Sequence, residues 1–135
     1  MWEITSSRTA YENRWIRVVE DQVVGPDGRP GVYGVVEVRN PAVFVVAVND
    51  ADDVLLETID RHTVGPSLEV PAGGNDGEDV VAAAKRELFE ETGYTAGSWR
   101  LLGSMNALNG ICRAPEYVFL AEDLTRSEEG ADAEA

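Results

Sequence analysis

The chain of 135 residues has very few of the side chains on which disulfide-linked and zinc-binding proteins depend. It contains one cysteine, Cys112, and one histidine, His62. A single cysteine excludes an internal disulfide and fits a reducing compartment. Zinc sites use several cysteine or histidine ligands, and neither residue has a second one near it in the sequence. We therefore expect neither a disulfide framework nor a zinc site.

Long hydrophobic runs are absent as well. The longest uncharged apolar stretch covers residues 41–48, far short of the roughly 20 residues that span a bilayer. The first residues, Met-Trp-Glu, show no basic segment followed by an apolar run, which a secretory signal would require. The sequence thus predicts a cytoplasmic protein with no membrane partner.

Basic residues are scarce too, since 11 Lys plus Arg stand against 25 Asp plus Glu, a formal net charge of −14. Nucleic acids and anionic lipid surfaces attract clustered Lys and Arg, but here these residues are spread singly along the chain. The composition therefore excludes nucleic acid as a partner. The acidic excess has two explanations, which are solubility and carboxylates gathered around a divalent cation.

The residues that are present predict one globular domain, because 44% of them are hydrophobic. Alternating and β-branched segments predict strands at residues 2–5, 15–24, 33–38, 42–48, 54–58, 99–105 and 117–121. Turns are expected at 25–31, which is rich in Gly and Pro, and at 49–53, which is rich in Asp. A helix is expected over residues 78–92, capped by Asn75 or Asp76 and ended by a left-handed Gly93.

One face of this expected helix carries three carboxylates. Glu87, Glu90 and Glu91 lie within about one turn and repel one another. Arg86 can pair with Glu90 four residues further on, but it cannot neutralise all three. A solvated acidic face and a divalent-cation site would each account for the cluster.

The surrounding sequence resembles the signature of the Nudix hydrolases. The segment Pro-Ala-Gly-Gly-Asn-Asp-Gly-Glu at 71–78 is followed, after seven residues, by Arg-Glu-Leu-Phe-Glu-Glu-Thr-Gly-Tyr at 86–94. The family pattern is Gly, five residues, Glu, seven residues, Arg-Glu, an aliphatic, any residue, Glu-Glu, any residue, Gly, an aliphatic. The positions that match in type and spacing are Glu78, Arg86, Glu87, Leu88, Glu90, Glu91 and Gly93. Two positions depart, because the loop after Gly73 is one residue short and Tyr94 replaces the final aliphatic.

The resemblance covers most of residues 1–121. Arg61, the run 11–18 and residues 68–73 are similar to the ADP-ribose pyrophosphatase branch. The family implies an α/β fold, an α/β/α sandwich with a mixed β-sheet and a loop-helix-loop catalytic motif. The expected organisation is a Nudix domain at 1–121, with N-terminal strands at 1–40 and the Nudix box at 71–94, followed by an acidic tail at 122–135.

The resemblance also implies an assembly and a C-terminal feature. Relatives in this branch commonly dimerise through their N-terminal strands, so a homodimer is expected. They usually continue into another helix after the last core strand. Here either residues 124–133 form a short helix or a partner covers one face of the sheet.

For the metal, the resemblance implies that Glu87 and Glu91 bind Mg²⁺, or Mn²⁺ in its place. Glu90 would be a further ligand or a supporting acid, and Ala72 would offer its main-chain carbonyl. Arg86 would orient the glutamates. A metal-bound water would then attack one phosphorus of a diphosphate and expel the other phosphate.

For the general base, the branch usually has a glutamate at the position that Ala114 occupies here. The nearest acid is Glu116, which is either this base or an exposed residue at the start of a strand. Glu90 or Glu91 would otherwise accept the proton.

For the substrate, Arg61 is the candidate phosphate clamp, and Glu69 is a second expected substrate-binding residue. Trp15 either stacks on a nucleobase or packs in the core or an interface. The predicted function is Mg²⁺-dependent hydrolysis of the diphosphate linkage in a nucleoside diphosphate derivative, with ADP-ribose or a nucleotide sugar as the expected substrate. The alternative, suggested by Ala114, is a catalytically weak nucleotide-binding or regulatory module with the Nudix fold.

Overall fold

The computed structural model describes residues 1–127, and the chain forms two compact units. One unit contains Met1–Pro41 and Asn106–Pro115, and the other contains Ala42–Met105 and the described residues from Glu116 onward. The sequence predicts one globular domain whose N-terminal strands end near residue 40. The structure divides the chain at that point and adds a second segment, 106–115, to the N-terminal unit.

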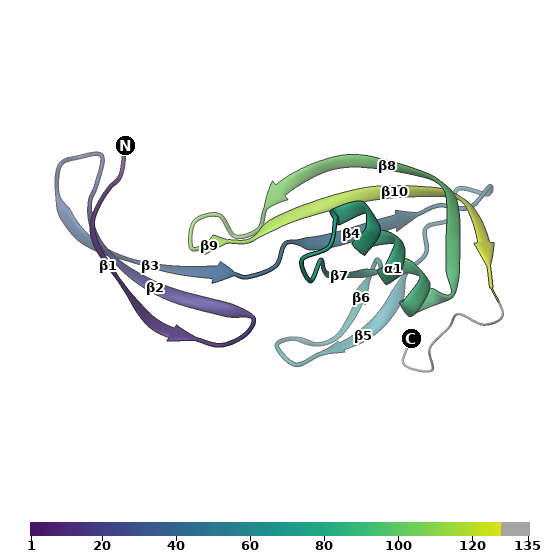
Figure 1. Ribbon diagram of the computed structural model, residues 1–135, viewed down its shortest axis with the longest axis horizontal. Coiled ribbons are helices and arrows are strands. Elements are labelled where there is room, and N and C mark those ends of the chain that lie inside the picture. The colour runs from purple at the N-terminus through teal and green to yellow at the C-terminus, as the bar shows by residue number, and fades with distance from the viewer. Residues whose placement is uncertain (128–135) are drawn as a thin grey trace. The chain divides into compact units, whose positions relative to one another are not determined.

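The N-terminal unit is a four-stranded sheet in the spatial order β1, β2, β3, β9 (Figure 1). Its strands are β1 Glu3–Glu12, β2 Ile16–Val24, β3 Pro30–Val38 and β9 Cys112–Arg113. The first three are antiparallel neighbours, whereas β9 runs parallel to β3. The turn predicted at 25–31 joins β2 to β3, with Gly28 at a φ of 80° and the Asp27 side chain accepting a hydrogen bond from the Arg29 backbone N–H.

One face of this sheet is buried within the unit. Val19, Asp21 and Val23 alternate along β2 and are all buried, together with Val35 of β3. Asp21 is the charged residue among them, and its carboxylate accepts a hydrogen bond from the Ser7 hydroxyl on β1. The strand β1 itself is exposed along its whole length.

The second unit is built on a mixed sheet in the order β7, β4, β10, β8. Its strands are β4 Ala42–Ala47, β7 Ala72–Gly74, β8 Tyr94–Asn106 and β10 Pro115–Arg126. β4 and β10 are parallel, from Ala42 beside Glu116 to Ala47 beside Ala121. β7 is antiparallel to β4 and forms one edge of the sheet.

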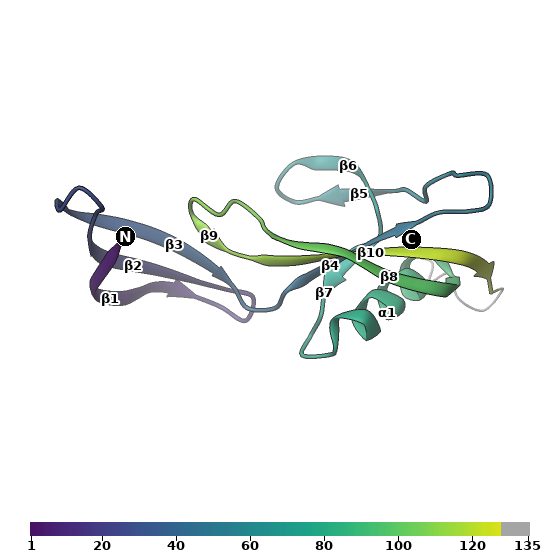
Figure 2. The same ribbon diagram turned by 90° about the horizontal axis from the view of Figure 1, so that it is seen from above.

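A hairpin and a helix lie on opposite sides of this sheet (Figure 2). The hairpin consists of β5 Glu57–Arg61 and β6 Gly65–Glu69, and the helix is α1 Val80–Thr92. The strand predicted at 54–58 begins later than expected, at Glu57, because Val54 forms only an isolated bridge with Val48. The turn predicted at 49–53 is confirmed, since the Asn49 side chain accepts hydrogen bonds from two backbone N–H groups within it.

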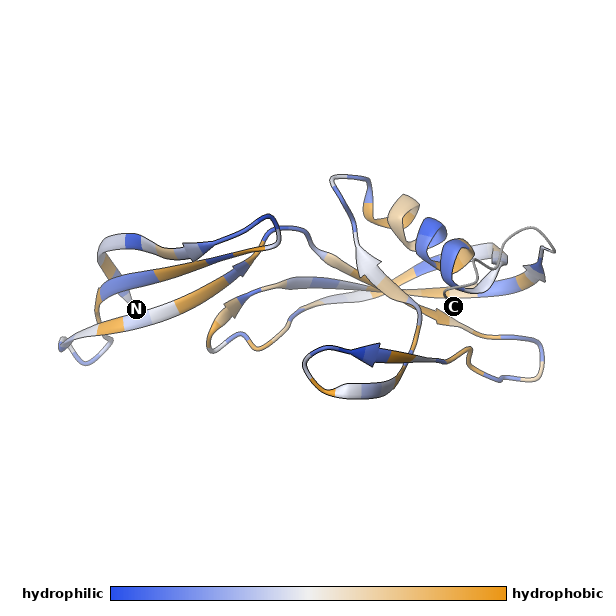
Figure 3. Cartoon of the chain, turned by 90° about the horizontal axis from the view of Figure 1, so that it is seen from below, coloured by the Kyte–Doolittle hydropathy of each residue, from blue (hydrophilic) through white to orange (hydrophobic). Residues whose placement is uncertain are grey.

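The core of the second unit lies between α1 and the sheet. Its buried residues are Val43, Val45, Ala47, Ala83, Ala84, Leu88, Phe119 and Ala121. Alternation along β4 turns one set of side chains toward this core, while the opposite set is half-buried. The helix α1 changes character along its length: its first half is hydrophobic and its second half is mostly hydrophilic (Figure 3).

The two ends of α1 differ in how well the sequence predicts them. Gly93 ends the helix with a φ of 76°, as expected, and its N–H donates to Phe89. The predicted N-cap is wrong, because Asp79 occupies that position without a side-chain bond. The Asn75 side chain instead bonds the backbone of Gly77 and Glu78, so it stabilises the loop before the helix.

The C-terminal strand is longer than predicted. β10 continues to Arg126. Residues 122–126 therefore lie in a strand and not in the acidic tail that was expected to begin at residue 122. The alternative of a helix over 124–133 is wrong for residues 124–126, which lie in this strand. Residues 128–133 of that expected helix lie outside the described residues.

The α/β class and the mixed sheet are confirmed. Among residues 1–127, α1 is the single helix, so the second helical layer of the expected sandwich has no counterpart there. The β5–β6 hairpin lies on that side of the sheet instead (Figure 2). Across the same residues, no helix has the length and apolar composition needed to cross a membrane.

Candidate functional site

The second half of α1 brings its carboxylates against β7. Ala84 and Leu88 are four residues apart and turn toward the core, so Glu87 and Glu91, also four apart, form the neighbouring stripe. The Glu87 carboxylate lies directly beside Gly73, where a Cβ atom would overlap it. A glycine at position 73 therefore leaves the space that this carboxylate occupies.

Glu91 anchors the helix to the edge strand. Its Oε2 accepts a hydrogen bond from the Ala72 N–H at 3.2 Å. Burial raises the pKa of Glu91 to about 8, and contact with the Glu57 carboxyl and the negative charge of Glu87 add to this increase. Burial likewise raises the pKa of Glu87, although the Arg86 cation opposes that change. Burial therefore disfavours the charged form of both carboxyl groups, a cost that a bound cation would offset.

Arg86 connects the loop before the helix to the helix itself. Its guanidinium donates to Glu78 Oε1 at 2.6 Å, Glu87 Oε1 at 3.0 Å, Glu90 Oε2 at 3.2 Å and the Gly74 carbonyl at 3.2 Å. Glu87 is 13% exposed and Glu90 55% exposed, so Glu90 is the member of the predicted cluster nearest to solvent. One arginine thus holds carboxylates from both ends of the loop-helix segment.

The hairpin supplies two residues predicted to bind substrate, Arg61 and Glu69, and joins them as a pair. Arg61 Nε donates to Glu69 Oε2 at 3.0 Å and Nη2 donates to Oε1 at 2.7 Å. These bonds lower the pKa of Glu69 to about 2. The Arg61 guanidinium is also attracted to the carboxylates of Glu91 and Glu57, so the hairpin and the helix share one electrostatic site.

Glu57 is a site residue that the sequence analysis missed. It lies on β5, directly opposite Glu69 of β6, and its carboxyl contacts that of Glu91. Little in the sequence indicates a site role for Glu57, because an acidic residue in a predicted strand is ordinarily exposed. Only the folding of the hairpin onto the second unit brings the Glu57 carboxyl to that of Glu91.

The structure does not bring Glu116 or Trp15 into this cluster. Glu116 pairs with Ala42, which pairs with Gly74 on the other side, so Glu116 lies two strands from β7. No hydrogen bond or ion pair joins it to the box within residues 1–127. Trp15 belongs to the N-terminal unit, where the Arg14 guanidinium lies 4.8 Å from its ring centroid.

The donor set suits a hard divalent cation, which prefers oxygen ligands. Two observations support the fit, namely the space beside Gly73 that the Glu87 carboxylate fills and the buried Oε1 of Glu57, which has no hydrogen-bond partner. In the part of the chain described, no group of three or more acidic, cysteine or histidine side chains is placed so that it could hold a metal ion. Rotation of the flexible glutamate side chains would have to close the ligand set.

Comparison with protein families divides the chain at nearly the same point as the structure. Residues 38–135 match the NUDIX domain, and residues 2–36 match the nucleoside diphosphate sugar hydrolase N-terminal domain. The resemblance seen in the sequence is thereby confirmed.

Several characterised relatives are similar over nearly the whole chain. The ADP-ribose pyrophosphatase of Mycobacterium tuberculosis is 35% identical over 126 residues, which cover 91% of this chain and 60% of the relative. The ADP-ribose pyrophosphatase of Bacillus subtilis is 32% identical, with coverages of 88% and 65%. The methanol dehydrogenase activator of Bacillus methanolicus is 30% identical, with coverages of 90% and 66%. The chain therefore spans about three fifths to two thirds of the length of these relatives.

A solved structure has the same fold. The crystal structure of an ADP compounds hydrolase superimposes with a TM-score of 0.82 at 26% identity, covering 98% of this chain and 73% of the other.

Proposed function

Because the chain belongs to the Nudix family, we propose that it hydrolyses the diphosphate linkage of a nucleoside diphosphate derivative in a reaction that requires Mg²⁺ or Mn²⁺. ADP-ribose or a nucleotide sugar is the proposed substrate, in line with the relatives named ADP-ribose pyrophosphatase. The observation that carries the proposal is the group of Glu87, Glu90 and Glu91 on α1. Arg86 bonds Glu87 and Glu90, and the Ala72 N–H of β7 bonds Glu91.

The carboxylates of the box would hold the cation. Glu87 and Glu91 are the proposed principal ligands, because both carboxyl groups are partly buried and this burial raises the pKa of each. Glu90 and the Ala72 carbonyl complete the proposed set. When bound, the cation supplies neutralisation of the diphosphate charge and a water of lowered pKa.

The proposed role of Arg86 is to position the carboxylates around it. Its bonds to Glu78, Glu87 and Glu90 fix the side chains on either side of the loop. A bidentate or multidentate guanidinium holds carboxylates in a defined orientation, which a lysine ammonium does not. We therefore assign Arg86 the role of orienting the ligands.

Arg61 is the proposed phosphate clamp. Glu69 engages its Nε and Nη2 atoms, whereas its Nη1 atom makes no hydrogen bond to the described residues. That nitrogen can donate to a phosphate oxygen while Glu69 continues to hold the guanidinium in place. Glu69 would thus serve substrate binding through Arg61, and Trp15 remains the proposed stacking partner for the base.

The proton acceptor is proposed among Glu90, Glu91 and Glu116. The geometry favours the first two, because both lie in the carboxylate cluster and Glu116 lies two strands from β7. Ala114 at the usual base position also supports the second candidate function, a nucleotide-binding module with little or no turnover. Loss of the usual base would leave cation and substrate binding intact while slowing proton transfer.

Turnover of a panel of diphosphate compounds, measured as phosphate or phosphomonoester release with and without Mg²⁺, tests the proposal. We expect hydrolysis only with the cation, and a loss of about 100-fold or more in Glu91→Gln, whose fold is checked by circular dichroism. A fully active Glu91→Gln would refute the assignment of the site. Ligand-induced thermal stabilisation without turnover of any compound would favour the binding module.

A further inference from the structure

We propose that Glu57 of β5 is an additional carboxylate ligand of the cation site, supplied by the hairpin from outside the Nudix box. The inference rests on the proposed function, because it presupposes a cation at Glu87 and Glu91. It adds a ligand from the opposite side of the sheet to those that α1 provides (Figure 2).

The Glu57 carboxyl has a buried oxygen without a partner. Glu57 Oε1 is buried and has no hydrogen-bond partner, and it is the one side-chain polar atom of this kind within residues 1–127. Burying a polar atom without a partner is unfavourable, and more so for a carboxylate. A solvated acidic surface does not explain Glu57, because this oxygen has no access to water.

No ion pair joins the Glu57 carboxyl to a cation among residues 1–127. Glu57 lies opposite Glu69 on the hairpin, and Arg61, the nearest cation on that hairpin, forms its bonds with Glu69. The Glu57 carboxyl meets the carboxyl of Glu91, whose described donor is the Ala72 N–H. Two carboxyl groups therefore meet, and the backbone N–H of Ala72 donates to that of Glu91.

The other cation near the box, Arg86, is also bonded elsewhere. Arg86 bonds to Glu78, Glu87 and Glu90 but to neither Glu57 nor Glu91. A divalent cation between Glu57, Glu87 and Glu91 would supply the missing charge and occupy the free Oε1 atom. Oxygen donors of this type are those that Mg²⁺ and Mn²⁺ prefer.

A purely structural role for Glu57 makes a different prediction. In Glu57→Gln the side-chain amide can donate to Glu91 and removes one negative charge, so the metal-free protein should be at least as stable as the wild type. If Glu57 also binds the cation, the same substitution must weaken metal binding. The stability of the metal-free protein would then be equal or higher while its affinity for the cation is lower, a combination that a structural role alone would not produce.

Isothermal titration of the metal-free protein with MnCl₂, together with thermal unfolding, provides the test. We expect Glu57→Gln to bind Mn²⁺ about tenfold more weakly or worse and to unfold at an equal or higher temperature without metal. Asp60→Asn is the matched control, because it removes one carboxylate from an exposed position of the same strand. It should bind Mn²⁺ as the wild type does, while Glu87→Gln should lose most binding.

Each outcome separates this inference from the proposed function. Wild-type Mn²⁺ affinity in Glu57→Gln, with weakened binding in Glu87→Gln, would overturn the role of Glu57 and leave the box as the metal site. Absence of Mn²⁺ binding by the wild type would overturn both. If Glu57→Gln does not fold, Glu57→Asp replaces it, since the carboxylate is retained but withdrawn by one methylene. Unchanged Mn²⁺ affinity in that variant would count against the proposal.

Discussion

At the scale of single residues, the carboxyl group of Glu91 links stability to pH. Its pKa lies at about 8, above the ordinary value of 4.5, because of burial and the neighbouring Glu57. A carboxyl with a raised pKa stabilises the folded state while it is protonated. This contribution is complete below pH 4.5 and is lost as the pH rises through about 8.

We therefore expect the unfolding temperature of the metal-free protein to fall between pH 5 and pH 9 when it is measured in the presence of EDTA. Glu91→Gln should flatten this dependence, since the amide does not ionise. Glu116→Gln is the control, because it removes a carboxylate two strands away from β7, and it should keep the wild-type slope. Equal slopes in the wild type and in Glu91→Gln would contradict the interpretation.

At the scale of secondary structure elements, the close approach of α1 to β7 is the decisive feature. Glu87 occupies the space in which a side chain at position 73 would lie. The backbone of Gly73 is not in the left-handed region, since its φ is not among the positive values of this chain. A substitution there acts through contact with Glu87 and not through backbone strain.

Gly73→Ala should therefore displace the Glu87 carboxylate, and because this is the end of a flexible side chain, the loss of folding stability should be below about 1 kcal/mol. Chemical denaturation measures this loss, and titration with Mn²⁺ should show weaker binding. Gly103→Ala on β8 is the matched control, because no atom lies within 4 Å of a Cβ at that position. If both variants behave like the wild type, the Gly73 contact has no energetic role.

The same elements show what local patterns could predict. The strand at 42–47 and the cap at Gly93 follow from residue type and spacing, and both are found. The N-cap was missed because Asn75 bonds within its own loop. The start of β5 was missed because Val54, although β-branched, forms only an isolated bridge.

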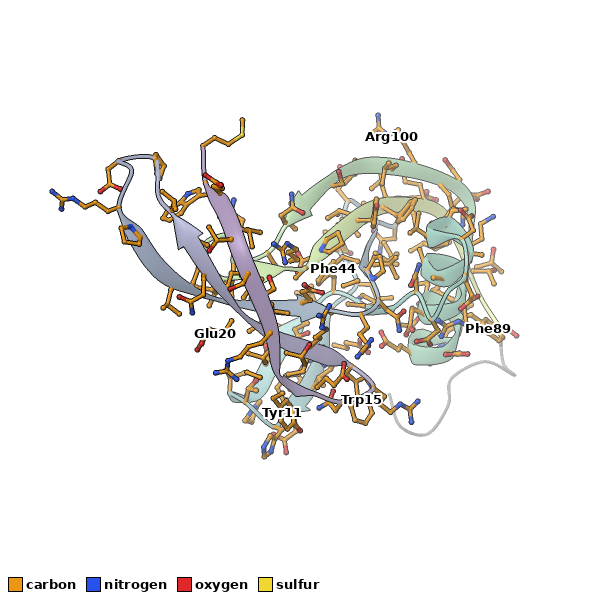
Figure 4. The ribbon with its side chains drawn as sticks, turned by 60° about the vertical axis from the view of Figure 1, so that its left-hand side comes forward. Tyr11, Trp15, Glu20, Phe44, Phe89 and Arg100 are labelled. Atoms are coloured by element: carbon orange, nitrogen blue, oxygen red, sulfur yellow. The ribbon has the colours of Figure 1, made fainter. Side chains whose placement is uncertain are left out.

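At the scale of the whole molecule, the N-terminal unit exposes several large apolar side chains, as the second unit also does. Trp2, Ile4, Tyr11 and Trp15 are each more than half exposed, and Figure 4 shows Tyr11 and Trp15 projecting from the same end of the β1–β2 hairpin. Surfaces of this kind favour association, and large aromatic residues are enriched in protein interfaces. The exposure supports the homodimer that the sequence predicts.

Light scattering coupled to size-exclusion chromatography should accordingly give about twice the chain mass of 14.6 kDa at micromolar concentration. Ile4→Glu should shift the protein toward the monomer, since it places a charge on the exposed strand β1. Arg100→Glu on β8 of the second unit is the control and should leave the mass unchanged. A monomeric mass for the wild type would contradict the dimer.

The sequence by itself determined the family, the mixed α/β class and the three box glutamates, because each depends on spacing within a short segment. Only the tertiary structure decided that Glu57 meets Glu91 and that Arg61 pairs with Glu69. Those contacts join residues separated in the chain, and they depend on how β5 pairs with β6 and where α1 packs on the sheet. Local spacing carries no information on such packing, and for that reason the metal ligand proposed on β5 could be inferred only from the folded chain.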